Sequence, residues 1–240
     1  MSRSRVSVVI PVKDDDRYLE RCLRALAAQT RPPREIVVVD NGSRDRSRRV
    51  ARRHGVRLVR ERRSGIPAAA SRGYDAARGP IIARLDADSV PPRDWVARIE
   101  RGFAADRRLD ALTGPGDFPA LSRLGKVLAG AAYMEAYFRL VGAFLGQPPL
   151  FGSNLALRRR AWRQVRRDVH RVDRRVHDDL DLSIHLAGRR VRLDRSLRVA
   201  VSARPFRSPL GMLRRVGMGA WTVLRHAPVL RRARVPGERP

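Results

Sequence analysis

Two aspartates one residue apart follow a short apolar run in the first half of the chain. The run begins at Ile81, after the Gly79-Pro80 turn, and leads into Asp86 and Asp88, a pattern typical of a buried strand. Side chains alternate along a strand, so both carboxylates leave it on one side, at the end where α/β sheets bind ligands. Adjacent acids repel each other unless a cation lies between them, and Mg²⁺ or Mn²⁺ carrying a diphosphate would supply one. The alternative is a pair of solvated acids in a turn.

A second acidic group, Asp178, Asp179 and Asp181, opens a helical pattern that Gly188 closes. Acids at the start of a helix cap it and complement its dipole. Capping accounts for one of them, and three acids in four positions of an arginine-dominated chain indicate a further role. A histidine beside them, His177 or His185, could add a metal ligand, although a lone histidine is more often a surface or packing residue.

Strands alternate with helices through the first part of the chain, which predicts a parallel sheet with right-handed crossovers. Pro11, Asp40 and the Asp86/Asp88 pair each end an apolar strand, and such ends gather at one edge of a parallel sheet. The segment after Asp40 also suits turn and helix-cap chemistry, which is the alternative there. The predicted strands are 6–11, 35–40, 56–59 and the one at 81, with helices near 18–26 and 67–77.

The second half of the chain is less regular. We expect a helix at 93–105 with Trp95 in the core, a strand at 109–114, a long helix or helix pair at 121–145, a loop at 149–159 and short strands at 191–193 and 197–201. Residues 204–234 form an arginine-rich amphipathic segment. It either lies on an anionic membrane surface or packs against the domain with a solvated basic face.

Composition limits the classes of partner. A length of 240 residues suits one sizeable core, and the net charge of +28 predicts attraction to polyanions. No basic run is interleaved with stacking aromatics, so phosphate-bearing ligands are favoured and nucleic acid is an unlikely partner.

Cys22 is the only cysteine, which excludes an internal disulfide. With neither a signal peptide nor a clean membrane span, we expect a cytoplasmic protein that could also be peripheral at the inner face of the cell membrane.

Three segments, Val6–Val12, Glu35–Asp45 and Leu85–Asp88, resemble the nucleotide-sugar half of family 2 glycosyltransferases in order and spacing. The resemblance covers roughly residues 5–205 and is strongest before residue 90. It implies a GT-A-like (Rossmann-like) α/β fold, a single domain whose mostly parallel sheet is flanked by helices. That domain would span 1–205, with a nucleotide-sugar half at 1–115 and an acceptor half at 116–205, and a basic helical extension at 206–240.

The resemblance also implies roles for individual residues. The divalent metal, Mn²⁺ or Mg²⁺, would be held by Asp88 with Asp86, and the donor would be a nucleotide-diphosphate sugar. The acceptor would be a glycan or a lipid-linked glycan, bound through a turn that resembles the family's Gly-x-Asn element, for which an ordinary loop is the alternative. The implied nucleotide-sugar contacts are Pro11, Val12, Asp40, Asn41, Gly42, Ser43, Gly65, Asp86 and Ala87, and the acceptor contacts are Gly152, Ser153, Asn154 and Asp178.

Asp179 matches the second acid of the pair that carries the catalytic base in this family, and the resemblance implies inversion at the sugar. Displacement at an anomeric carbon needs a carboxylate within hydrogen-bond reach of the acceptor hydroxyl. One departure is Ala70, which stands where the family often has an arginine that approaches the nucleotide; Arg62, Arg63 or Arg72 could replace it. A nucleotidyltransferase and a non-catalytic nucleic-acid-binding module remain the alternatives.

Overall fold

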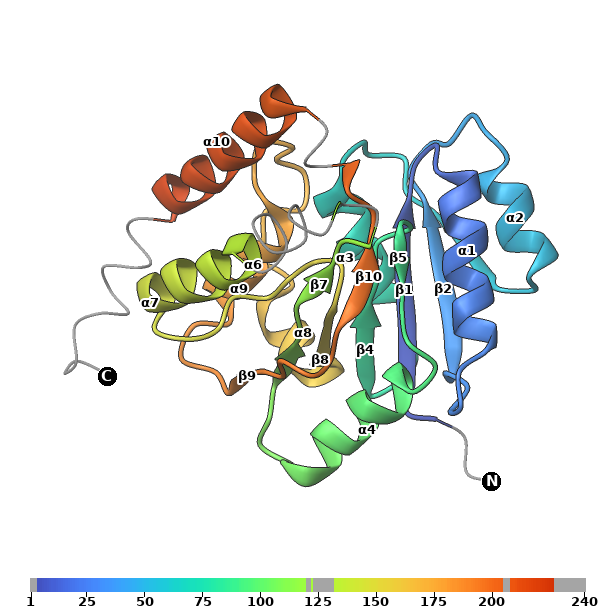
Figure 1. Ribbon diagram of the computed structural model, residues 1–240, viewed down its shortest axis with the longest axis horizontal. Helices are drawn as coiled ribbons and strands as arrows, with labels where there is room; N and C mark the ends of the chain where they lie inside the picture. The colour runs from blue at the N-terminus through green and yellow to red at the C-terminus, as the bar shows by residue number, and fades with distance from the viewer. Residues whose placement is uncertain (1–3, 120–121, 123–131, 205–207, 227–240) are drawn as a thin grey trace.

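A seven-stranded sheet forms the centre of the computed structural model, which describes residues 4–119, 122, 132–204 and 208–226 (Figure 1). Its strand order is β3-β2-β1-β4-β8-β6-β9, and only β8 runs antiparallel to its neighbours. The mostly parallel α/β architecture predicted from the sequence is therefore confirmed. The strands are β1 (Val6–Val12), β2 (Glu35–Asp40), β3 (Arg57–Arg60), β4 (Ile81–Arg84), β6 (Ala111–Thr113), β8 (Leu155–Arg158) and β9 (Val191–Leu193).

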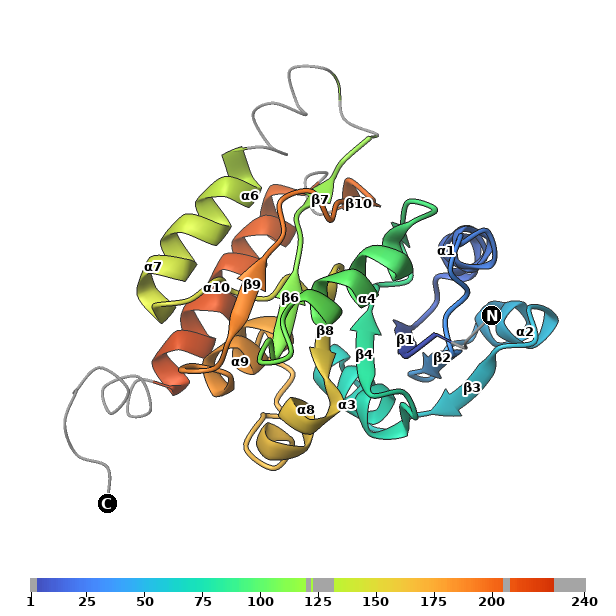
Figure 2. The same cartoon turned by 90° about the horizontal axis from the view of Figure 1, so that it is seen from below.

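Helices cover both faces of this sheet, as the view along it shows (Figure 2). On β1, Val8 and Ile10 contribute to the apolar cluster on one face, while Val9 contributes to the cluster on the other. A strand buried on both faces has the continuous apolar sequence seen here. The first face is covered by α1 (Asp16–Ala27) and α4 (Trp95–Ala105), and the second by α3 (Ile66–Ala76), α8 (Arg159–Val165) and α9 (Asp178–His185); α2 (Ser47–Arg53) packs beside α1.

Small residues bring α3 close to the sheet. A Cβ on Gly73 would lie 2.2 Å from Cγ1 of Val9, so only glycine permits this approach. Ala69 and Ala70 are buried beside it. The close packing holds the N-terminal end of α3 next to the carboxyl end of β1, where the predicted ligand residues lie.

A smaller sheet and a C-terminal helix complete the fold. The sheet contains β5 (Ser89–Val90), β10 (Val199–Val201) and β7 (Gly116–Asp117) in that order. The helix α10 (Pro209–Arg225) lies beside α9, and α6 (Ala132–Ala136), the π-helical turn η2 (Tyr137–Val141) and α7 (Gly142–Leu145) follow one another. Among the described residues, no helix has both the length and the apolar character needed to cross a bilayer.

The second half departs from its predicted elements in two places. Residues 155–158, expected to lie in a loop, form β8 in the middle of the sheet, because burial outweighs the weak strand preference of Leu and Ala. Much of the helix expected at 121–145 lies outside the described residues, and its described part, from 132 onward, is helical. The segment expected to be helical at 204–234 contains α10, and its residues after 226 lie outside the described part. The division at residues 115 and 205 stays a prediction.

Candidate active site

A cavity of about 400 Å³ opens at the carboxyl ends of β1, β2 and β4. The residues with predicted ligand roles that line it are Pro11, Val12, Asn41, Gly65, Asp86, Ala87, Asp88 and Ser153. The others, Asp40, Gly42, Ser43, Gly152, Asn154, Asp178 and Asp179, are not among its lining residues. Strand ends distant in sequence therefore meet around one cavity, which is the arrangement predicted for Pro11, Asp86 and Asp88.

Asp88 lies within the cavity wall and is only 13% exposed. It accepts hydrogen bonds from Ser202 Oγ at 2.5 Å and from Arg204 Nη2 at 3.0 Å. Burial and the neighbouring charge of Asp86 raise the pKa of Asp88 above its ordinary value despite these two contacts. The Asp88 carboxyl is therefore harder to ionise here than in water, and a further cation beside it would favour its charged form.

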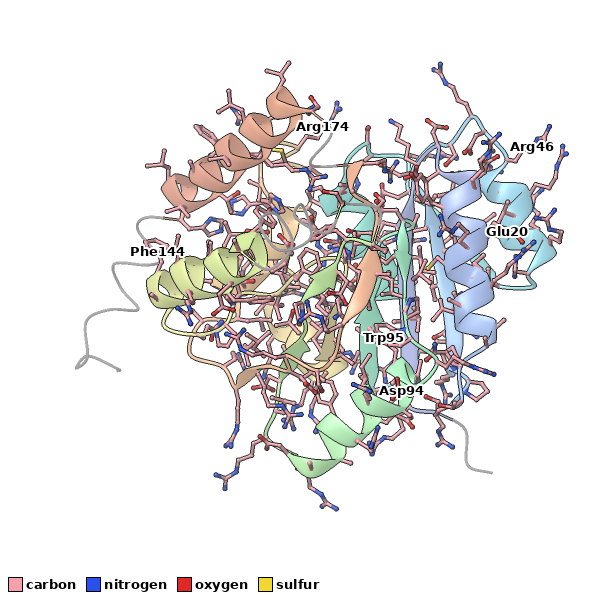
Figure 3. All side chains as sticks on the ribbon, in the orientation of Figure 1. Glu20, Arg46, Asp94, Trp95, Phe144 and Arg174 are labelled. Carbon is pink, nitrogen blue, oxygen red and sulfur yellow. The ribbon has the colours of Figure 1, made fainter. Side chains whose placement is uncertain are left out.

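Four cationic side chains line the same cavity among the described residues, namely Lys13, Arg174, Arg204 and Arg215. Arg204 joins two acids, because Nη1 lies 2.6 Å from Asp15 Oδ1 while Nη2 contacts Asp88. Arg174, labelled in Figure 3, packs beside Gly65. A Cβ added to Gly65 would lie 3.1 Å from Cγ of Arg174. Sequence reasoning missed these arginines because they come from segments far from the strand ends and stand among dozens of others.

The turn after β2 is built largely by its own polar groups. Asp40 accepts a hydrogen bond from the Ser43 backbone N–H at 2.9 Å and is buried. Asn41 donates to the Arg63 carbonyl at 2.7 Å and accepts from the Gly65 N–H at 2.8 Å. Asn41 therefore ties the end of β2 to the segment before α3. The turn chemistry raised as the alternative for Asp40 is present.

A buried arginine that the sequence did not single out connects the two acidic groups. Alternation along β4 places Ile82 and Arg84 on the face covered by α3 and α9, so the Arg84 side chain meets the start of α9. Its guanidinium donates to Asp86 Oδ1 at 2.9 Å and also contacts Asp178. Arg84 is 2% exposed, so these charges neutralise one another where little water competes.

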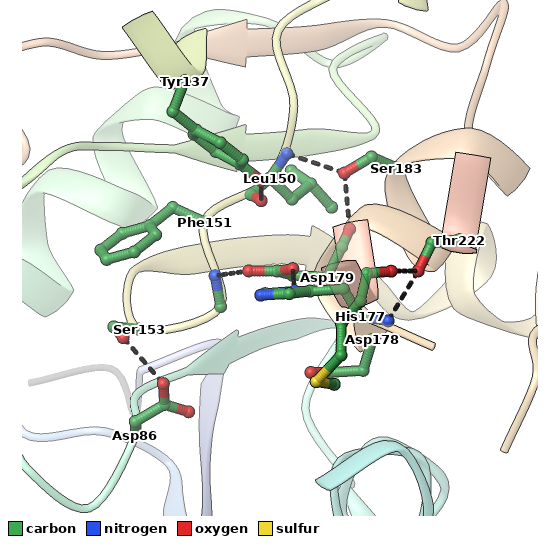
Figure 4. A network of polar contacts seen from close by, with 12 residues as sticks. Asp86, Tyr137, Leu150, Phe151, Ser153, His177, Asp178, Asp179, Ser183 and Thr222 are labelled. Atoms are coloured by element: carbon green, nitrogen blue, oxygen red, sulfur yellow. Dashed lines mark hydrogen bonds and ion pairs between the residues drawn. The ribbon is translucent and has the colours of Figure 1, made fainter. Parts of the chain in front are cut away.

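The turn between Phe151 and Asn154 lies between Asp86 and Asp179 (Figure 4). Ser153 Oγ donates to Asp86 Oδ2 at 2.7 Å, while the Gly152 N–H donates to Asp179 Oδ2, also at 2.7 Å. A Cβ on Gly152 would lie 3.0 Å from Asp179 Oδ2. Adjacent residues of one turn thus contact the cavity carboxylate on one side and the predicted base on the other.

Asp179 is ionised and paired with His177. The two side chains meet at 2.5 Å, between Asp179 Oδ1 and His177 Nδ1. Burial opposes ionisation, yet the charges of His177 and Arg84 lower the pKa of Asp179 to about 2. The charge of Asp179 raises the pKa of His177 to about 9. Asp178 behaves differently, because burial raises its pKa in spite of Arg84.

Asn154, predicted to contact the acceptor, is fully buried. Its Oδ1 accepts from the Trp95 indole N–H at 2.9 Å, and its Nδ2 donates to the Leu197 carbonyl at 2.5 Å. Trp95 is also fully buried, on the first turn of α4, as predicted (Figure 3). In this structure the Asn154 amide therefore links α4 to the segment before β10.

Comparison with known proteins supports the family resemblance. Residues 7–163, more than half of the chain, match the model of glycosyl transferase family 2. The chain belongs to this family. Glycosyltransferase AglE of Haloferax volcanii is 36% identical over 107 residues, which cover 41% of this chain and 34% of AglE. An undecaprenyl-phosphate 4-deoxy-4-formamido-L-arabinose transferase of Pseudomonas paraeruginosa is 38% identical over 104 residues, covering 39% of this chain and 31% of that enzyme.

Nearly the whole chain shares its fold with solved structures. Glucosyl-3-phosphoglycerate synthase of Mycobacterium tuberculosis, solved with Mn²⁺, UDP and glucosyl-3-phosphoglycerate, superposes with a TM-score of 0.65 at 19% identity. The match covers 98% of this chain and 82% of the synthase. By contrast, the matched segments span only about a third of AglE and of the arabinose transferase.

Proposed function

We propose that this family 2 chain is a nucleotide-sugar-dependent glycosyltransferase that moves a sugar from a nucleoside diphosphate to an acceptor hydroxyl. The observation that carries the proposal is the cavity in which Asp86 and Asp88 lie with four cationic side chains. A diphosphate needs cations around it, and a carboxylate pair lends itself to a metal that shares its coordination with phosphate. The volume of about 400 Å³ falls in the usual range for small-ligand sites.

The donor would lie along the strand ends. Pro11, Val12, Asn41 and Gly65 form the part of the wall proposed to hold the base and ribose, with Asp40, Gly42 and Ser43 shaping the turn behind them. Lys13 and Arg174 extend into the same cavity and would contact phosphate oxygens. Arg174 would then make the contact that Ala70 cannot.

Asp86 and Asp88 fit a hard divalent ion, because both offer carboxylate oxygens at the cavity wall. These two residues would hold Mn²⁺ or Mg²⁺, and the ion, when bound, would stabilise negative charge on the leaving diphosphate. Ser153 and Arg84 hold Asp86 in place from the other side. Arg204 would have to release Asp88 and would then be free to contact a phosphate.

Asp179 is proposed as the base that accepts the proton of the acceptor hydroxyl, with inversion at the anomeric carbon. Its low pKa keeps it ionised at neutral pH, and His177 fixes its orientation. The Gly152–Ser153 turn and Asp178 would border the acceptor, since they separate Asp179 from Asp86. To accept a proton, Asp179 Oδ2 would have to exchange its hydrogen bond from the Gly152 N–H for the acceptor hydroxyl, while His177 keeps Oδ1.

The acceptor is proposed to be a glycan, lipid-linked or of the cell envelope, used at the cytoplasmic face of the membrane. The name of the Pseudomonas relative refers to an undecaprenyl-phosphate compound. In this chain α10 exposes Leu210, Leu213, Val216 and Leu224 by 61–76%. Apolar residues interspersed with arginines are typical of helices that lie on anionic lipid.

The test is product analysis with the purified full chain. Candidate nucleotide sugars and polyprenyl-phosphate acceptors are incubated with Mn²⁺, and released nucleoside diphosphate and glycosylated acceptor are measured together with the anomeric configuration. The proposal expects wild type to form nucleoside diphosphate and glycosylated acceptor in equal amounts. Asp117→Asn, a surface control whose side chain is about half exposed, should form the same amounts as wild type. Release of sugar 1-phosphate in place of nucleoside diphosphate would indicate transfer of the nucleotidyl group, as in a nucleotidyltransferase. Salt-sensitive DNA binding with no transfer would indicate a nucleic-acid-binding module.

A further inference from the structure

Three of the five histidines of the chain gather around one carboxylate outside the catalytic cavity. Asp181 and His185 lie one turn apart on α9, His226 directly follows α10, and His170 comes from the segment between α8 and α9. Asp181 and His226 are almost fully buried, at 3% and 1% exposure of their side chains. None of the four lines the cavity that contains Asp86 and Asp88.

The ligand atoms of this cluster converge on one point. Asp181 Oδ1 lies 2.9 Å from His170 Nδ1, 2.9 Å from His226 Nε2 and 3.4 Å from His185 Nε2. The Nε2 atoms of His185 and His226 are 3.2 Å apart. A tetrahedral metal with bonds of about 2.0 Å has ligands about 3.3 Å from one another, which is close to these separations.

Outer hydrogen bonds orient the cluster as they do around bound metals. His226 Nδ1 lies 2.7 Å from the Thr222 carbonyl and must donate to it, which leaves a lone pair on Nε2 of the neutral ring. Asp181 Oδ2 accepts the backbone N–H of His170 at 2.7 Å, so Oδ1 alone faces the rings. Metal-bound histidines commonly have such a carbonyl partner on their second nitrogen.

Protons alone cannot give every ligand atom of this cluster a well-aligned hydrogen bond. The lone pair of His226 Nε2 points at a carboxylate oxygen and at a second ring nitrogen, and a proton there can serve only one of these contacts well. A single cation in the centre would serve all four ligand atoms at once. Three imidazoles and one carboxylate form a donor set that suits Zn²⁺ and disfavours Mg²⁺ or Mn²⁺.

We propose that His170, Asp181, His185 and His226 form a closed structural Zn²⁺ site that fastens α10 to α9. Four protein ligands would leave no open position for chemistry. The metal would add to the few contacts that hold α10: Thr222 and His226 are buried and Val223 packs against the Leu180 and Ile184 cluster, while Leu210, Leu213 and Leu224 are exposed. Arg215 on α10 lines the catalytic cavity, so the metal would hold one wall of that cavity in place. The inference does not depend on the proposed transferase activity.

The experiment titrates chelator-treated full-length chain with Zn²⁺ by calorimetry and with Co²⁺ by visible absorption. We expect one equivalent of Zn²⁺ in wild type, a tetrahedral Co²⁺ spectrum with nitrogen ligands, and a higher Tm with metal. His226→Gln and His185→Gln should each weaken Zn²⁺ binding by roughly 100-fold or more. Asp88→Asn should leave it unchanged, which separates this site from the proposed catalytic one.

The two histidines outside the cluster provide matched controls. His54→Gln and His177→Gln should each retain the full equivalent of Zn²⁺ and the Co²⁺ spectrum. If His226→Gln fails to fold, His185→Gln and the wild-type Co²⁺ spectrum still decide the question. Absence of stoichiometric uptake, an octahedral Co²⁺ spectrum, or uptake lost only in His177→Gln would overturn the proposal. In the metal-bound chain, α10 should resist trypsin cleavage at Arg214 and Arg215, and chelator should remove that resistance.

Discussion

The two acidic groups of this protein are neutralised in different ways. Asp88 is paired with Arg204, which is 42% exposed and comes from the segment after β10. Asp178 is paired with Arg84, which is 2% exposed and fixed in the central sheet. Asp179 is held by His177 and by the backbone of Gly152. The exposed partner of Asp88 can therefore be exchanged for a metal ion. By contrast, the buried Arg84 holds Asp178 together with Asp86, and His177 holds Asp179, as suits a positioned base.

Substitution of Asp179 on α9 gives the largest expected effect and the sharpest test of this contrast. Asp179→Asn keeps the shape of the side chain and removes its basicity, so transfer should fall by about 10²- to 10⁴-fold. Donor affinity should stay within a few-fold of wild type, because Asp179 does not line the cavity. Steady-state kinetics and donor titration check this, with Asp173→Asn, an acid of the preceding segment that is paired with Arg175, as the control. Wild-type turnover in Asp179→Asn would remove the assigned base.

The permanent pairing of Arg84 predicts a large loss of stability on its removal. Arg84→Met leaves Asp86 and Asp178 without their buried partner and should lower the free energy of unfolding by about 3–5 kcal/mol. Arg198→Met removes a surface partner of Asp117 that is 45% exposed, and should cost at most about 1 kcal/mol. Urea unfolding measures both. Adding Asp178→Asn to Arg84→Met should recover part of the loss, and equal effects of the two arginines would contradict the contrast.

The His177–Asp179 pair predicts a pH dependence. The pKa of His177 is raised from 6.5 to about 9, and that of Asp179 is lowered from 3.8 to about 2. The pair therefore contributes fully to stability between about pH 4 and 6.5, and the contribution is lost as the pH rises through about 9 or falls through about 2. The difference in unfolding free energy between wild type and His177→Gln should be on the order of 1–3 kcal/mol at pH 6 and should shrink toward zero by pH 10. His54→Gln, which removes a contact to Glu20, is the control. A difference that grows with pH would have the wrong sign.

The smallest expected effect concerns Ser153, in the turn between Asp86 and Asp179. Ser153→Ala removes the hydroxyl that donates to Asp86 and should cost about 0.5–1.5 kcal/mol of stability or of metal affinity. Ser196→Ala removes an exposed hydroxyl bonded to Asp194 and should change neither. Thermal unfolding with and without Mn²⁺ measures both variants. Identical behaviour of the two would show that Ser153 does not support the metal site.

The first half of the fold was predictable because β1, β2 and β4 are mostly apolar runs that end in polar turns. β8 was not, since Leu155–Arg158 lacks β-branched residues and becomes a strand only through pairing with β4 and β6. Asp86 and Asp88 line the cavity, but strand alternation does not place them there, because β4 ends at Arg84 and both acids lie in the connection that follows. Sequence reasoning did not single out Arg84, Arg174, Arg204, His170 or His226, because partners of each come from distant segments. His185, one turn after Asp181, was raised as a possible metal ligand, but its neighbours His170 and His226 were not.

Titration of UDP with wild type and Asp88→Asn, in the presence and absence of Mn²⁺, tests the central claim most directly. Calorimetry should show Mn²⁺-dependent binding to wild type that is lost in Asp88→Asn, while Asp94→Asn, an exposed acid of similar size, behaves as wild type. GDP and dTDP are measured in parallel so that the choice of base does not decide the outcome. Binding of any of these nucleotides with equal affinity in Asp88→Asn, with or without metal, would contradict the assignment of this cavity as a metal-dependent donor site.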